Sequence, residues 1–361
     1  MYKRPKSWLI VLALALFVRI WAFFPALVER GYSDGLYPVI SRMQRALLGW
    51  IPFSIGDVLY GAAVLYLLAK LVRGIRASFR KKAGGVKAFW WKSLQRVIYW
   101  CLWIYVSFNL LWGLNYNREG IARQLQLEMK PYSTGELEMA VHQIIHRLDE
   151  THAAALRDRE SFRRKSLLFD ESFRCYQSAE AYYPFLHYRT ASVKPSVFSY
   201  LGDYLGFTGY YNPFSGEAQV NTTVPPFVQP FTTCHEMGHQ LGYAKENEAN
   251  FAGYLSAKSS ADTGFLYSVY FDLYVYGMRD LYRRDSLVAK AIKKQVPPQV
   301  KKDLAELRAF YDRYQNPFEP LITGLYGQYL RANQQPSGMQ SYNEVMAFLI
   351  AYGKKYGWEA L

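Results

Sequence analysis

His235-Glu236-Met237-Gly238-His239 is the stretch of this sequence that decides how its C-terminal part is built. Residues four positions apart lie on one face of a helix, so the two imidazoles can reach a single metal ion. Glu236 follows the first histidine and can sit beside an open coordination position of that metal. The spacing predicts a zinc hydrolase, in which two histidines and a third ligand hold Zn²⁺ and Glu236 takes the proton of a polarised water.

A third zinc ligand is expected soon after this motif. Gly242 can end the first helix, because glycine adopts the left-handed cap conformation at little cost, and a second helix is predicted from about Lys245. That helix opens with two carboxylates, Glu246 and Glu248. The pattern E-x-x-A-N that begins at Glu246 resembles the E-x-x-A-D of gluzincin metallopeptidases. The resemblance favours Glu246 as the ligand, leaves Glu248 as the alternative, and implies that Asn250 supports a histidine ligand.

Four stretches of the chain resemble one known family. Residues 209–221, 230–242, 246–251 and 338–343 are similar to a family of bacterial membrane proteins known only as a domain of unknown function, which carries the H-E-x-x-H signature. The likeness extends to the apolar start of the chain. It implies a membrane-anchored domain with a zincin-like fold, and it implies no substrate.

A short strand region is expected just before the motif, at residues 196–223. The loop 212–216 separates two β-prone runs, as in a hairpin. Zincins bind extended substrate backbone along an edge strand above the metal, so we expect residues 217–221 to form that strand and to bind substrate. An ordinary sheet strand is the alternative. The residues concerned are Glu217, Ala218, Gln219, Val220 and Asn221.

The first third of the chain holds three apolar segments, at about residues 8–28, 52–72 and 97–116. Each is close to the ~20 residues that a membrane-spanning helix needs. The loop 73–96 between the second and third segments carries eight Lys and Arg and no acidic residue, which places it in the cytoplasm. We therefore predict a multi-pass protein of the inner (cytoplasmic) membrane. Residues 1–117 would be the anchor, contacting lipid through three helices, and 118–361 a periplasmic or extracellular domain.

The segment 36–47 has helical apolar spacing and is expected to lie at the membrane interface between the first two spans. The net charge of +14 does not indicate a nucleic-acid partner. Residues 1–114 carry 16 basic side chains against three acidic ones, and the rest of the chain carries 27 against 26. The excess therefore belongs to the anchor, where it serves topology and lipid contact.

The domain after residue 117 is expected to be mainly helical with a small sheet. Capping boxes at Ser133–Glu136 and Ser341–Glu344 predict two helix starts. In zincins a tyrosine or histidine usually stabilises the negative charge of the transition state, and the resemblance of the C-terminal region implies Tyr342 or Tyr329 for this role. Cys175 and Cys234 are both outside the predicted spans, and their spacing does not decide whether they form a disulfide.

These patterns together predict a membrane-anchored zinc metallopeptidase that hydrolyses a peptide or protein substrate. Zn²⁺ would be the cofactor and Glu236 the general base. The alternative is an envelope receptor or scaffold that keeps a zincin fold without turnover. The intact Glu236 favours the enzyme, because a purely structural metal site gains nothing from a general base.

Overall fold

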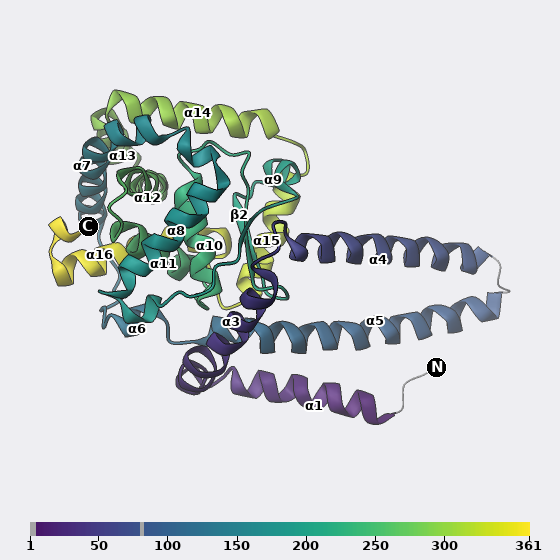
Figure 1. Cartoon of the computed structure of the whole chain (residues 1–361). Helices are drawn as coiled ribbons and strands as arrows, with labels where there is room; N and C mark the ends of the chain where they lie inside the picture. The colour runs from purple at the N-terminus through teal and green to yellow at the C-terminus, as the bar shows by residue number, and fades with distance from the viewer. Residues whose placement is uncertain (1–4, 80–82) are drawn as a thin grey trace.

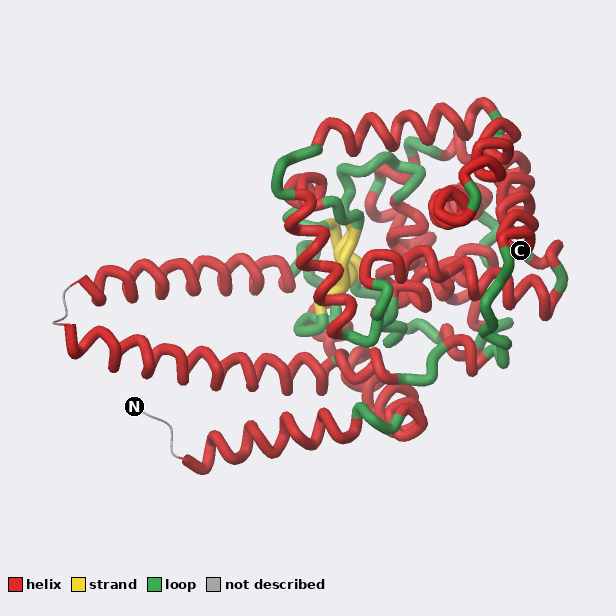
Figure 2. Tube along the Cα trace, turned by 180° about the vertical axis from the view of Figure 1, so that it is seen from behind, coloured by secondary structure: helices red, strands yellow, loops and turns green. Residues whose placement is uncertain are grey.

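The computed structural model describes residues 5–79 and 83–361. It is mainly helical with one small three-stranded sheet, as the sequence predicts. Three long helices project side by side from a helical domain that holds the rest of the chain (Figure 1). Seen from behind, the sheet lies at the side of that domain from which the long helices leave (Figure 2).

The N-terminal part is made of helices throughout. They are α1 (Pro5–Trp21), α2 (Pro25–Leu27), the π-helical η1 (Val28–Leu36), α3 (Tyr37–Leu48), α4 (Ile55–Phe79) and α5 (Ala83–Leu111). Helix α1 packs along α5, where the Trp8 and Tyr99 rings lie 5.1 Å apart and Val11 and Val106 are buried between them.

The expectation of three membrane spans is not met in full. Helix α4 is long and apolar enough to cross a membrane, and the bent pair formed by α1 and α2–α3 would be a second candidate. The first predicted span is interrupted, because α1 ends at Trp21 and the chain turns by 104° before the helix that begins at Pro25. Proline lacks the N–H that would continue the helix. Among the described residues, α5 is not a further candidate; it ends at Leu111, five residues before the end of the predicted span.

The predicted loop 73–96 is helical over most of its length. Helix α4 continues to Phe79 and α5 already begins at Ala83. This stretch contains no proline, and Arg, Lys and Ala favour helices even when they are exposed. Residues 80–82 and 1–4, which carry part of the predicted basic charge, lie outside the described residues.

The sheet has the strand order β1-β3-β2. Its strands are β1 (Val193–Pro195), β2 (Gly209–Asn212) and β3 (Glu217–Val220). The predicted hairpin is confirmed, because β2 runs antiparallel to β3 with Asn212 opposite Glu217. Strand β1 pairs with the other side of β3 in parallel, with Val193 opposite Ala218. Strand β3 is therefore the central strand, with all four residues buried.

The other helices surround one large apolar core. They are η2 (Gly113–Asn117), α6 (Ile121–Gln124), α7 (Thr134–Asp158), η3 (Ser161–Arg163), α8 (Lys165–Glu180), η4 (Pro184–Leu186), α9 (Ser199–Leu205), α10 (Gln229–Gln240), α11 (Glu246–Lys258), α12 (Thr263–Arg284), α13 (Ser286–Gln295), α14 (Pro298–Tyr314), α15 (Glu319–Ala332), η5 (Gly338–Glu344), α16 (Val345–Tyr356) and η6 (Trp358–Ala360).

One of the two predicted capping boxes is present. The Ser133 side chain accepts from the Glu136 amide and Glu136 accepts from the Ser133 amide, which starts α7. The second prediction is wrong, because Ser341–Glu344 forms the end of the 3₁₀ turn η5 and α16 begins after it, at Val345. Cys175 and Cys234 are buried and free, so they do not form a disulfide here.

The N-terminal helices and the domain that follows them are packed together rather than joined by a free linker. Arg118, just after η2, forms a buried ion pair with Glu29 of η1 at 2.7 Å. The Glu217 carboxylate of β3 accepts from the amides of Ile55 and Gly56 at 3.2 and 2.6 Å, at the start of α4. An acidic group is favourable at a helix N-terminus, so the sheet caps this helix.

Candidate metal centre

The H-E-x-x-H motif lies on α10, and every residue of this helix is buried. Pro230 occupies the first turn, where a missing N–H costs nothing. The helix ends as predicted: Gly242 has φ +87, the left-handed conformation that glycine adopts most easily. The chain then turns at once into α11, whose first residue is Glu246.

Two glycines let α11 pack closely against α10. A Cβ at Gly238 would lie 3.2 Å from the Ala249 carbonyl oxygen, and one at Gly253 would lie 3.2 Å from the His235 amide nitrogen. Larger residues at these positions would push the two helices apart. The short connection and this close approach bring the start of α11 over the histidine face of α10.

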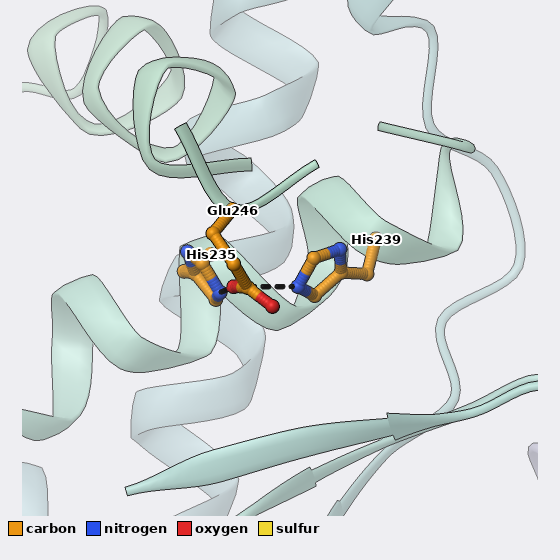
Figure 3. Close-up of side chains that lie close together, drawn as sticks. All are labelled: His235, His239 and Glu246. Atoms are coloured by element: carbon orange, nitrogen blue, oxygen red, sulfur yellow. Dashed lines mark ion pairs between the residues drawn. The ribbon is translucent and has the colours of Figure 1, made fainter. Parts of the chain in front are cut away.

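His235, His239 and Glu246 converge as the sequence predicts. Glu246 Oε2 lies 3.2 Å from His235 Nε2 and 3.4 Å from His239 Nε2. The two imidazole rings are 4.7 Å apart and nearly perpendicular, with the carboxylate between them (Figure 3). One ligand atom from each residue lies within 4.8 Å of the others, close enough to hold one metal ion. Among the described residues, this is the single such group.

The orientation of His239 is fixed by the backbone around it. Its Nδ1 lies 2.7 Å from the Tyr243 carbonyl oxygen, so Nδ1 donates and Nε2 is left as the metal-facing atom. The Trp112 indole donates to the His239 carbonyl oxygen at 3.0 Å, and the two rings are 5.8 Å apart. Trp112 directly follows α5, so the N-terminal part of the chain supports this histidine.

Burial and the Glu246 charge set the electrostatics of the two histidines. Burial lowers the pKa of both, but the charge of Glu246 and its hydrogen bond outweigh burial at His239 and raise its pKa to about 8. At His235 burial prevails and the pKa stays below its usual value. Burial alone would raise the pKa of Glu246, yet the two imidazoles hold it well below the ordinary range.

Glu236 is buried beside this group and is not one of its ligands. Burial raises the pKa of Glu236 to about 8. Its Oε2 is buried without a hydrogen-bond partner. A Cβ at Gly209 would lie only 2.6 Å from Glu236 Oε1, so the start of strand β2 runs directly past this carboxylate. The glycine at this position leaves the space that Glu236 occupies.

Glu248, the alternative third ligand, lies elsewhere. A Cβ at Gly120 would be 2.1 Å from Glu248 Oε1, so this carboxylate is packed against the Gly120 backbone. The same oxygen is 3.8 Å from Lys245 Nζ. Glu248 is two residues beyond Glu246 and therefore points to a different side of α11, away from the histidines.

The predicted substrate strand is not an edge strand. Residues Glu217, Ala218, Gln219 and Val220 form β3, which has a partner strand on each side. Asn221, the last residue of the predicted strand, donates from its side chain to Asp203 at 2.7 Å. The prediction failed because polar–apolar alternation does not reveal a strand's place in a sheet. The edge strand beside Glu236 is β2 instead.

The Asn250 side chain interacts with His235 and raises its pKa, which agrees with the predicted support of a histidine ligand. The contact does not have the geometry of a normal hydrogen bond, because His235 Nδ1 has no such partner. The Asn250 amide donates to the Tyr342 carbonyl oxygen at 3.2 Å, which holds η5 over the site.

Tyrosines from α15 and η5 cover the ligands. The Tyr342 ring stacks on His235 with centroids 6.2 Å apart, so this predicted residue is at the site. Tyr326 is closer to the ligands, because its hydroxyl donates to Glu246 Oε1 at 3.1 Å and lies 3.3 Å from the Tyr342 hydroxyl. Tyr329, the other candidate, lies 3.3 Å from the Tyr116 hydroxyl. With 31 tyrosines in the chain, no pattern in the sequence could single out Tyr326.

A family model described as "Protein of unknown function (DUF3810)" matches residues 32–350, which includes the metal centre and most of the N-terminal helices. The chain belongs to this family. The resemblance found in the sequence is therefore confirmed at the level of a family without an assigned function. No curated protein and no solved structure matches the chain.

Proposed function

We propose that this protein is a membrane-anchored, zinc-dependent peptidase. The observation that carries the proposal is the convergence of His235 Nε2, His239 Nε2 and Glu246 Oε2 beside the buried carboxylate of Glu236. Two imidazoles and one carboxylate are the ligand set of many catalytic zinc sites, and three protein ligands leave one coordination position open. Structural zinc sites usually have four protein ligands instead.

The residues fit a metal ion. Glu236 Oε2 and Glu246 Oε2 are buried without hydrogen-bond partners, a cost that a protein rarely carries without a reason. The backbone carbonyl of Tyr243 already presents His239 in the tautomer that binds a metal. Zinc bound here would act as a Lewis acid that polarises a substrate carbonyl and lowers the pKa of water.

Glu236 would serve as general base and then as general acid. A carboxylate whose pKa is raised towards 8 by burial is suited to taking a proton from water and passing it to the leaving amine near neutral pH. A bound cation would lower that pKa and favour the ionised, proton-accepting form. Tyr326 holds Glu246 in place, and Tyr342 stays the candidate for stabilising the developing negative charge.

Strand β2 is the better candidate for binding an extended substrate. The Asn221 amide donates to the Thr208 carbonyl oxygen at 2.8 Å, so Thr208 and Asn221 form a hydrogen-bonded pair of the ladder, one residue before β2 begins. In an antiparallel ladder such pairs alternate, so the backbone groups of Gly209 point away from β3. They lie beside Glu236, where a peptide could add as a further strand.

Attachment to a membrane is supported by α4, whose apolar side chains, such as Leu65 and Leu67, are exposed. We propose a multi-pass protein of the inner membrane with residues 118–361 on the outer side. The basic residues in 73–96, which include the end of α4 and the start of α5, favour this orientation, because positive residues remain in the cytoplasm.

A receptor or scaffold without turnover is the second candidate. The observation in its favour is that the metal-binding side chains are buried and covered by Tyr326 and Tyr342. Such a protein would bind metal and would not need Glu236 as a base.

Two measurements test the proposal. Elemental analysis of the purified full chain should find about one zinc per chain, and His235→Ala should lose it. A quenched fluorescent peptide library should be cleaved by the native protein, whereas Glu236→Gln should keep its zinc and lose cleavage. Native protein without zinc would refute the metal site. Zinc-loaded protein that is inactive on every peptide would favour the scaffold.

A further inference from the structure

An exposed apolar surface lies beside the metal centre, on α9 and α15. We call it the apolar rim, and its members are Val197, Tyr200, Leu201, Phe318, Leu321 and Leu325. The two segments are joined, since the Asn316 side chain, just before α15, donates to the Tyr204 carbonyl oxygen of α9 at 2.7 Å. Exposed apolar patches of this kind mark surfaces that contact a membrane or another protein.

The apolar rim is linked to the proposed metal ligands through helix α15. Leu325 of the rim is followed in α15 by Tyr326, whose hydroxyl donates to Glu246. Only Gly327 and Leu330 of α15 are buried, so this helix covers the site with little packing of its own. Whatever contacts the rim therefore lies next to the point where a substrate must reach the metal.

The rim also lies next to helix α4. The Phe198 ring, just before α9, is 3.7 Å from the position of a Cβ at Gly61 of α4. Val58 and Leu59 on this part of α4 are exposed as well. Figures 1 and 2 both place α15 at the end of the domain from which α4 leaves. The rim therefore borders the apolar surface of the proposed membrane helix.

Helix α3, at the C-terminal end of α10, has a similar arrangement. Its buried face holds the end of the metal-binding helix, because Tyr37 and Ser41 both donate to the Gln240 carbonyl oxygen at 2.9 Å. Its opposite face exposes Val39 and Met43. An amphipathic helix next to membrane spans is typical of the lipid–water interface.

We infer that the apolar rim rests in the lipid–water interface, and that the substrate is a polypeptide segment held at the same bilayer by its own membrane anchor. The substrate class rests on the proposed peptidase function. The position of the rim beside α4 favours lipid over a soluble partner as its contact. Confinement of enzyme and substrate to one surface raises their effective concentration, which favours a tethered substrate over the same peptide in solution.

The position of the rim can be measured without any activity. Nitroxide labels at Leu321→Cys, in the rim, and at Leu287→Cys, on α13, would be compared in a Cys101→Ser background. Leu321 and Leu287 are 60% and 75% exposed, so both sites accept a label, and the two remaining cysteines are buried. The full chain would be placed in vesicles of phosphatidylethanolamine and phosphatidylglycerol.

The label at 321 should be relaxed mainly by oxygen, which concentrates in lipid, and the label at 287 mainly by a water-soluble nickel complex. The ratio of oxygen accessibility to nickel accessibility should differ at least fivefold between the two labels. A label at 321 that is as accessible to the nickel complex as the label at 287 would overturn the inference. Unchanged zinc content in both variants would show that the site is intact.

The substrate class is tested with one quenched peptide library made with and without a palmitoyl chain. In vesicles, the lipidated form should be cleaved at least tenfold faster. The double variant Leu321→Asn and Leu325→Asn should lose most of this advantage. The matched control, Leu167→Asn and Leu287→Asn on α8 and α13, should keep it. Equal cleavage of both forms by the native protein would overturn only the substrate class, whereas no cleavage of either form would overturn the proposed function itself.

Discussion

Zinc binding should release about two protons from this protein at pH 7. The pKa values of His239 and Glu236 are both raised to about 8 in the metal-free protein, so each group is roughly nine-tenths protonated at pH 7. His239 must lose its proton to become a ligand, and the cation favours the ionised form of Glu236. The lowered pKa values of His235 and Glu246 mean that these two ligands are already free of protons at pH 7.

The release of two protons makes zinc affinity steeply dependent on pH. Below about pH 7 the association constant should fall roughly a hundredfold for each unit of pH, or about 2.7 kcal/mol, because one released proton corresponds to about 1.4 kcal/mol per unit. Above about pH 9 the two groups have already lost their protons, and the dependence should disappear.

The proton count is measured by isothermal titration calorimetry of zinc into the metal-free full chain. Titrations in buffers of different ionisation enthalpy give a slope that equals the number of protons released. That slope should be close to two at pH 7 and close to one at pH 8. Glu236→Gln should reduce it by about one at pH 7 while zinc still binds. A slope near zero at pH 7, or a slope that Glu236→Gln leaves unchanged, would refute the electrostatic account of the site.

Three further outcomes follow from the geometry. Gly209→Ala should abolish peptide cleavage and leave zinc bound, because the new Cβ would lie 2.6 Å from Glu236 Oε1 and displace the base. Tyr326→Phe should weaken zinc binding about tenfold in a chelator competition, since Glu246 loses the hydroxyl that orients it. The metal-free protein should lose thermal stability between about pH 5 and pH 8, and Glu236→Gln should lose less. Glu236 and His239 each have a higher pKa in the folded protein than in the unfolded chain. Each group therefore stabilises the folded state at pH values below its pKa in the unfolded chain, and this stabilisation is lost as the pH rises through about 8.

Each of these outcomes has a control and a result that would contradict it. Gly135→Ala, on an open helix surface, should leave cleavage intact, and full activity of Gly209→Ala would argue against the assigned position of the base. Tyr329→Phe should keep native zinc affinity, because its hydroxyl faces Tyr116 rather than a ligand. Equal affinity in the Tyr326 and Tyr329 variants would count against the role of Tyr326. A melting midpoint that rises from pH 6 to pH 8 would contradict the sign of the pKa shifts.

Where the sequence was read correctly, the information was local. The spacing of His235 and His239 places both on one helix face whatever the surroundings. Gly242 ends the helix, and residues 212–216 connect the strands of a hairpin. Each of these features depends on the backbone conformation of only a few neighbouring residues. The preference for Glu246 over Glu248 rested on the resemblance of E-x-x-A-N to the gluzincin pattern, which also lies within a few residues.

Where the sequence was misread, the missing information was a contact with a distant part of the chain. The alternation of polar and apolar residues in 217–221 indicates a strand, but only the pairing of β1 and β2 on either side makes that strand central. The apolar segment 8–28 is long enough for a span, yet the chain turns after Trp21 and packs back as η1 and α3. Tyr326 reaches Glu246 from 80 residues away.

The sequence by itself determined the types of the candidate ligand residues, their spacing and the apolar start of the chain. Helix periodicity and side-chain chemistry act over a few residues, so they can be read without a fold. Only the tertiary structure decided that Tyr37 of α3 and Trp112, just after α5, hold the end of helix α10. It also decided that Gly209 lies beside Glu236 and that an apolar surface borders the site. Such contacts depend on how close-packed elements meet, and that packing is a property of the whole chain.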